Sequence, residues 1–145
     1  MRFLEKLSPL SLLGLRLALG VIFFYHGYEK LTKHSNDALA AFTGLGLPSY
    51  VFYIVGTLEL FGAILLVMGL LTRFTALILA IEMGVALARV DLPRGSIYAV
   101  HNYELALALC AGAFALATTG AGLLSLDAAT FERGGKGRPK AKSGQ

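Results

Sequence analysis

The sequence predicts an all-α, polytopic membrane protein with four transmembrane helices in an antiparallel bundle. Three observations support this fold class. Hydrophobic residues make up 56% of the 145-residue chain, and its mean hydropathy is +0.67. Only 15% of the residues are charged, below the roughly 25% that is usual in soluble domains. The apolar residues also gather in four stretches, each close to the about 20 residues that a transmembrane helix needs.

The first two spans are predicted at about residues 8–31 and 48–71. The first contains the run LLGLRLALGVIFFY, in which Arg16 is the only charge. The second begins at Pro48, which suits the first turn of a helix because its missing N–H needs no partner there. Glu59 is the only charge inside this second span, so both spans are apolar enough to enter a membrane.

The last two spans are predicted at about residues 73–92 and 102–126. The strictly apolar part of the third span is short, so we expect Arg89 to extend its charge to the membrane surface. The fourth span has no charge between Glu104 and Asp127. The four spans together form the predicted transmembrane domain.

This transmembrane domain covers residues 1–127, and residues 128–145 form a basic tail that we expect to be disordered. Lys and Arg are enriched on the cytoplasmic side of membrane proteins. Eight of those that lie at or beyond the ends of the spans are on the side that holds both termini, and four are on the other side. We therefore predict a cytoplasmic (inner) membrane protein with both termini in the cytoplasm. Its expected partner is membrane lipid, not nucleic acid.

Three ionisable residues lie inside the predicted spans, where a charge costs about 2.5 to 3.5 kcal/mol on insertion scales. At 1.5 Å per residue, Arg16, Glu59 and Glu82 lie about 12, 18 and 14 Å from the same face of the membrane. We therefore predict that they form one charge cluster. One Arg leaves one of two carboxyl groups without a partner, and low dielectric favours its protonated form. The sequence leaves open whether this cluster exchanges protons or only ties three helices together.

A second polar layer is predicted near the outer ends of the helices. Its candidate ligand-binding residues are His26, Tyr28, His101, Tyr103 and Glu104. Imidazole and phenol groups of this layer could bond the carbonyl of a ligand such as a quinone. Haem is not expected, because a pair of axial histidines usually lies deeper in apolar surroundings. No metal site is expected either, since a single cysteine provides no cysteine cluster.

Four segments of the chain resemble, in order, the helices of the DoxX family of membrane proteins. They are LRLALGVIFFYHGYEKL, GTLELFGAILLVMGLLTR, IEMGVALARVD and NYELALALCAGAFALATTGAGLLSLD. The resemblance covers about residues 12–127. It implies a four-helix protein of a bacterial or archaeal cytoplasmic membrane, with Arg16, Glu59, Glu82 and Glu104 as its polar core.

The resemblance also implies a connection to redox chemistry, because members of the family have been named as subunits of quinone-linked oxidoreductases or associated with redox stress. Our leading interpretation is a membrane subunit of a quinone-linked redox system. One alternative is a non-catalytic anchor for a soluble redox enzyme, and another is a small transporter or permeability factor. A soluble or membrane redox partner protein is expected in the first two cases, and the sequence leaves open a homo-oligomer.

Overall fold

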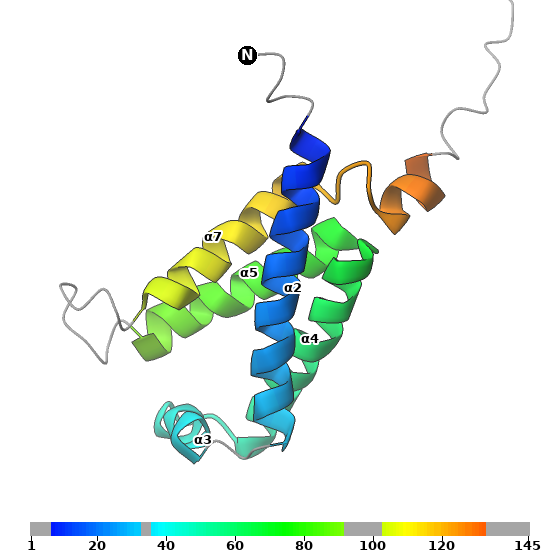
Figure 1. Ribbon diagram of the computed structural model, residues 1–145. Helices are drawn as coiled ribbons and strands as arrows, with labels where there is room; N and C mark the ends of the chain where they lie inside the picture. The colour runs from blue at the N-terminus through cyan, green and yellow to red at the C-terminus, as the bar shows by residue number, and fades with distance from the viewer. Residues whose placement is uncertain (1–6, 33–35, 92–102, 133–145) are drawn as a thin grey trace, which may run out of the picture.

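The computed structural model describes residues 7–32, 36–91 and 103–132, and all regular structure in these residues is helical. The four longest helices are α2 (Ser8–Thr32), α4 (Ser49–Met68), α5 (Thr72–Ala86) and α7 (Glu104–Thr119) (Figure 1). Three shorter elements are the helix α3 (Asn36–Gly44) and the π-helical turns η1 (Leu87–Asp91) and η3 (Ala128–Glu132). The prediction of an all-helical chain is therefore confirmed.

Two of these helices, α2 and α4, are long and apolar enough to cross a membrane. The helix α7 is apolar but shorter, and α5 continues directly into η1. The predicted fourth span reaches 126, but α7 ends at Thr119. The cause is that Gly120 and Gly122 have φ angles of +85° and +75°, a conformation that glycine adopts readily and that ends the helix.

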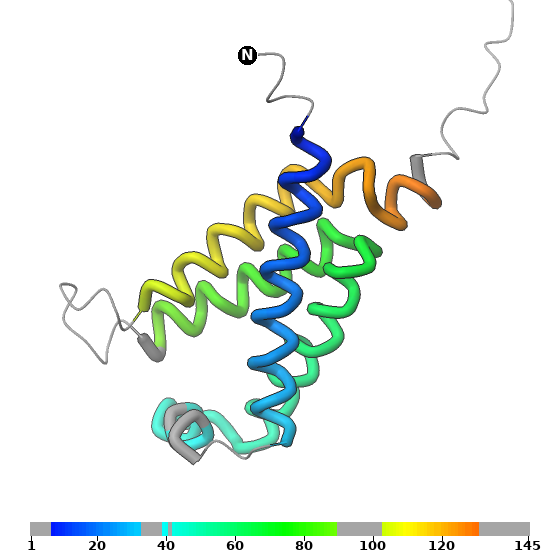
Figure 2. The backbone as a smooth tube through the Cα atoms, in the orientation of Figure 1, coloured from blue at the N-terminus to red at the C-terminus, as the bar shows by residue number. Residues whose placement is uncertain are grey.

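The long helices pack as two pairs. Figures 1 and 2 show α2 beside α4 and α5 beside α7, with the second pair inclined to the first. Glycines allow the close approach within the first pair: a Cβ atom added at Gly27 would lie 2.6 Å from Leu60 N and 2.7 Å from Gly56 O. Small residues of this kind let helix backbones come together in a membrane, where the hydrophobic effect does not drive association.

The core lies between the two pairs. Buried residues of all four long helices form it: Leu19, Phe23, Ala63, Leu66, Ala76, Leu79, Ala80, Met83, Leu109, Ala113 and Leu116. The outward faces are apolar as well, with Val21 67%, Phe61 62% and Phe74 65% exposed. An apolar exterior this extensive is unusual in a soluble monomer and suits helices that face lipid.

The molecule has two ends that are used below. The terminal end holds the start of α2, the turn between α4 and α5, and the segment that follows α7 (Figure 1). The loop end holds the end of α2, the helix α3 and the start of α4. The candidate site lies at the loop end.

Candidate functional site

An ion pair joins α2 to α4 inside the molecule. The Nζ of Lys30 lies 2.5 Å from Oε2 of Glu59 and donates a hydrogen bond to it. The side chain of Glu59 is 1% exposed and that of Lys30 is 17% exposed. A carboxylate that is this well buried needs a cation beside it, and Lys30 supplies that cation.

The antiparallel register of α2 and α4 explains why these two residues meet. Gly27 lies against Gly56 and Leu60, and the next turn of α2 places the Cβ of Lys30 against Gly56, about one turn before Glu59. Helical side chains also tilt toward the N-terminus of their own helix. In antiparallel helices this tilt turns Lys30 and Glu59 toward each other.

Glu82 of α5 completes a group of three ionisable residues with Lys30 and Glu59. The charges of both these residues act on its carboxyl group. The carboxyl groups of Glu82 and Glu59 come close, yet neither oxygen of Glu82 has a hydrogen bond of standard geometry within the part of the chain that the structure describes. Both oxygens are buried, so Glu82, beside the Glu59 carboxyl group, keeps hydrogen-bonding capacity for a ligand.

A cavity of about 720 Å³ adjoins this charge group. Residues of α3, α4, α5 and η1 form most of its wall, and most of them are apolar: Phe42, Leu45, Leu47, Val51, Val55, Ile81, Met83, Val85, Ala86 and Ala88. Its charged lining residues are Lys30, Glu82 and Arg89. An apolar pocket with a few polar groups at one side is typical of small-molecule sites.

The helix α3 forms one side of the cavity because it is attached to α4 by aromatic packing. The rings of Phe42 and Phe52 meet edge to face, with centroids 5.4 Å apart. Phe52 is fully buried and Phe42 lines the cavity. The position of α3 is therefore set by a contact of the kind that aromatic rings prefer.

The predicted cluster of Arg16 with Glu59 and Glu82 is wrong as a single group. The Nη1 and Nη2 of Arg16 donate to the carbonyl oxygens of Ala121 and Leu124, at 2.8 and 2.7 Å. Both acceptors belong to the segment that follows α7, at the terminal end. The depth estimate failed because it treated the ends of the helices as level, whereas the Arg16 guanidinium lies beside Gly69, ten residues after Glu59. The tilt of the side chain toward the start of α2 adds to this separation.

The segment after α7, whose carbonyl oxygens accept the hydrogen bonds of Arg16, is also hydrogen-bonded to the turn between α4 and α5. The carboxylate of Asp127 accepts hydrogen bonds from the backbone N–H groups of Leu71 and Thr72, at 2.7 and 2.9 Å. The backbone N–H of Asp127 donates to the carbonyl oxygen of Gly69 at 2.9 Å. Arg16 and Asp127 thus close the terminal end of the molecule and make a structural site, distinct from the cavity.

Comparison with known proteins agrees with this architecture. The sequence model of the DoxX family matches residues 11–92, which are more than half of the chain. The chain belongs to the DoxX family. The matched range contains Lys30, Glu59 and Glu82, so the whole charge group of this DoxX protein lies within the family domain.

Two relatives match the DoxX chain over most of their length. One from Bacillus subtilis (strain 168) is 31% identical over 129 residues, covering 89% of this chain and 93% of the relative, and is named "Putative oxidoreductase CatD". One from Haemophilus influenzae is 30% identical over 136 residues, covering 92% of this chain and all of the relative. No solved structure matches the chain at a significant level.

A third relative bears on the location of the DoxX chain. It is a Mycobacterium tuberculosis protein named "Uncharacterized membrane protein Rv3486". It is 31% identical over 84 residues, which are 57% of this chain and 52% of the relative. Together with two helices that are long enough to span, this supports a membrane protein.

The described ones among the other sequence-predicted ligand residues of the DoxX chain do not line the cavity. His26 is half-buried with its ring edge against Tyr25, and the exposed Tyr28 stacks on Phe24. Tyr103 and Glu104 begin α7. None of His26, Tyr28, Tyr103 and Glu104 is among the described residues that line the cavity, and His101 lies outside the described residues.

Sequence reasoning did not assign a role in the site to Lys30 or Arg89. The signal was present, because Lys30 follows Arg16, Gly20, Phe23 and Gly27 on one face of α2 at helical spacing. All four of these residues, Arg16, Gly20, Phe23 and Gly27, are buried, as that spacing predicts. What the sequence did not provide was the register of α2 against α4, which makes Lys30 the partner of Glu59.

Proposed function

We propose that this DoxX protein is the quinone-binding membrane subunit of a redox system, and that the cavity beside Lys30 and Glu82 is its quinone site. The observation that carries the proposal is the cavity itself. The cavity has a volume of about 720 Å³, which lies within the range of roughly 300 to 1,000 Å³ that is usual for small-molecule sites. Its apolar walls adjoin a buried group of three ionisable side chains.

The chemistry of the lining residues fits a quinone. A quinone has a flat apolar ring and two carbonyl oxygens that accept hydrogen bonds. Lys30 has three N–H donors, and Glu59 takes one of them, so donors remain for a ligand oxygen. Glu82 adds a buried carboxyl group without a hydrogen-bond partner of standard geometry among the described residues.

The proposed roles follow from the balance of the reaction. Reduction of a quinone to a quinol takes up two electrons and two protons. We assign the electrons to a reduced partner protein of the redox system. Glu82 in its protonated form gives a proton to one ligand oxygen and regains a proton from water, while Lys30 holds an oxygen by a hydrogen bond. The second proton also comes from water by this route.

Two further observations support the proposal. A relative that covers 89% of the chain is named as an oxidoreductase. The cavity also lies among apolar helix faces, through which a lipid-soluble ligand can enter from a bilayer. As part of the proposal, α5 with η1 and α7 also cross the membrane, giving four spans with both termini in the cytoplasm.

The experiment is mass spectrometry of the small molecules that the protein retains after gentle purification with native lipids. We expect a quinone in wild-type protein and less of it in Ala88→Trp, which fills the cavity with an indole ring. Ala18→Trp is the matched control, because Ala18 is exposed on α2 and does not line the cavity. Absence of quinone from the wild-type protein would favour the anchor alternative.

A further inference from the structure

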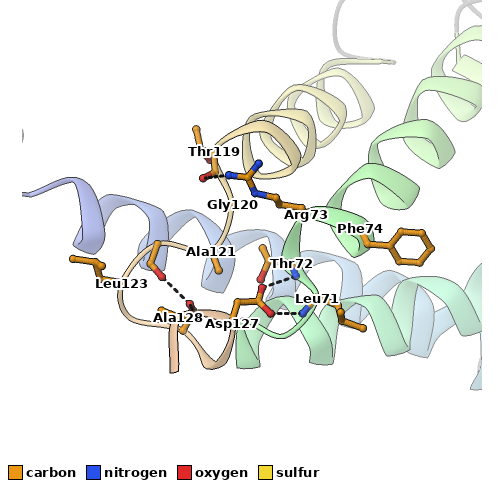
Figure 3. Close-up of a pocket in the computed structure, with 12 residues that line it drawn as sticks. Leu71, Thr72, Arg73, Phe74, Thr119, Gly120, Ala121, Leu123, Asp127 and Ala128 are labelled. Atoms are coloured by element: carbon orange, nitrogen blue, oxygen red, sulfur yellow. Dashed lines mark hydrogen bonds between the residues drawn. The ribbon is translucent and has the colours of Figure 1, made fainter. Parts of the chain in front are cut away.

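A second cavity lies at the terminal end, away from the proposed quinone site. It has a volume of about 500 Å³ and lies between the start of α5 and the segment that follows α7. Figure 3 shows its lining residues, among them Thr72, Arg73, Thr119 and Asp127. Neither the family match nor the proposed function gives this cavity a role.

Two opposite charges line this cavity without forming an ion pair with each other in the described part of the chain. Arg73 is exposed and turns toward α7, where its Nη2 donates to the carbonyl oxygen of Thr119 at 3.4 Å (Figure 3). Its guanidinium lies over Gly120, since a Cβ there would be 2.9 Å from Arg73 Nε. Asp127 turns instead to the backbone N–H groups at the start of α5.

Both charged groups keep hydrogen-bonding capacity for a ligand. A guanidinium has five N–H donors, and Arg73 uses one of them in a long bond. Each carboxylate oxygen of Asp127 accepts one hydrogen bond from the protein, although it can accept two. Thr72 also lines the cavity, and its buried Oγ1 has no partner among the described residues.

The cavity is bordered by large apolar side chains that face outward. Leu71, Phe74 and Leu123 line it and are 50%, 65% and 69% exposed. Apolar residues beside two opposite charges, near the end of membrane-facing helices, are the arrangement expected where polar headgroups meet acyl chains.

We propose that this cavity binds the headgroup of an amine-bearing phospholipid, a phosphate with a primary ammonium as in phosphatidylethanolamine. The phosphate pairs with Arg73, and the ammonium donates hydrogen bonds to Asp127. The one positive and one negative charge of the lining complement a zwitterion better than a headgroup that is only anionic. The exposed Leu71, Phe74 and Leu123 contact the acyl chains, which distinguishes a lipid from a soluble phosphate.

The test is native mass spectrometry of the delipidated full chain in detergent with equal amounts of phosphatidylethanolamine, phosphatidylglycerol and phosphatidylcholine. We expect at least fivefold preference for phosphatidylethanolamine over each of the other two lipids. The headgroup of phosphatidylglycerol has no cation, and the quaternary ammonium of phosphatidylcholine has no N–H donor. Arg73→Gln should reduce its binding at least fivefold, and Arg89→Gln, an exposed arginine at the other cavity, should not. Equal binding of phosphatidylethanolamine and phosphatidylglycerol, or unchanged binding in Arg73→Gln, overturns the proposal.

Two further measurements complete the test. Asp127→Asn should bring the ratio of phosphatidylethanolamine binding to phosphatidylglycerol binding close to one. If this variant does not fold, the comparison of phosphatidylethanolamine with phosphatidylcholine in the wild type decides the role of the ammonium. Soluble phosphoethanolamine at the same concentration should not displace the lipid. Displacement would show that acyl chains contribute nothing and would overturn the lipid assignment. Because the site is separate from the quinone cavity, either proposal can fail without the other.

Discussion

The ammonium of Lys30 and the carboxylate of Glu59 are held 2.5 Å apart, joining α2 to α4 beside the larger cavity. Glu59 is 1% exposed, so water does not stabilise its charge and the ion pair must do so. The Lys30 side chain therefore has two roles: it stabilises the pair of helices α2 and α4, and it forms part of the polar side of the proposed ligand site.

Removal of Lys30 should therefore be costly. Lys30→Met leaves a buried carboxylate without its cation and should destabilise the fold by about 3 to 5 kcal/mol. Lys30→Met with Glu59→Leu should recover much of this loss, because no buried charge remains. Unfolding in mixed micelles measures both effects. Arg89→Gln is the exposed control, expected within about 0.5 kcal/mol of wild type. Additive losses from the two substitutions would contradict the pair.

Arg16 should behave independently of Glu59. Arg16→Lys keeps the charge but loses the two-pronged contact with Ala121 and Leu124, at an expected cost of about 2 to 4 kcal/mol. The released segment after α7 should become more sensitive to limited proteolysis. Glu59→Gln should not restore stability to Arg16→Leu. If it did, Arg16 and Glu59 would be coupled, contrary to the structure.

The glycine contacts between α2 and α4 give a third prediction. Gly27→Ala places a methyl group 2.6 Å from Leu60 N, so the two backbones must separate, at an expected cost of about 1 to 3 kcal/mol. Gly14→Ala is the matched control on the same helix, because nothing lies within 4 Å of its added Cβ. That control should be neutral or stabilising by up to about 1 kcal/mol. Equal effects of the two substitutions in thermal unfolding would show that Gly27 is not a contact point.

The helices were predictable because long apolar runs between charges have few other structural solutions. The end of α7 was not predicted, although Gly120 and Gly122 could have indicated it. The partners of Arg16 were beyond prediction, because they are backbone carbonyl groups more than 100 residues along the chain, which any residue type provides. Sequence patterns locate a buried charge, but its partner depends on the register between helices and on the tilt of its side chain.

Glu82 should give a spectroscopic signal if it exchanges protons with a bound quinone. We expect a carboxyl band in the infrared difference spectrum between the oxidised and the reduced ligand. The band arises because the protonation or the hydrogen bonding of the Glu82 carboxyl group changes when the ligand is reduced. Glu82→Gln should remove the band while the protein remains folded. Glu104→Gln, an exposed carboxyl outside the cavity, should retain it. A band that persists in Glu82→Gln would assign the proton exchange to another group.

The central claim is that the cavity beside Lys30 and Glu82 holds the quinone, and direct titration of the purified protein with a short-chain quinone tests it. Saturable binding is predicted for the wild type and for Ala18→Trp. Ala88→Trp should weaken binding at least tenfold, which corresponds to about 1.4 kcal/mol, because the indole ring occupies the ligand volume. Equal affinity of wild type and Ala88→Trp, or no saturable binding to the wild type, would contradict the claim.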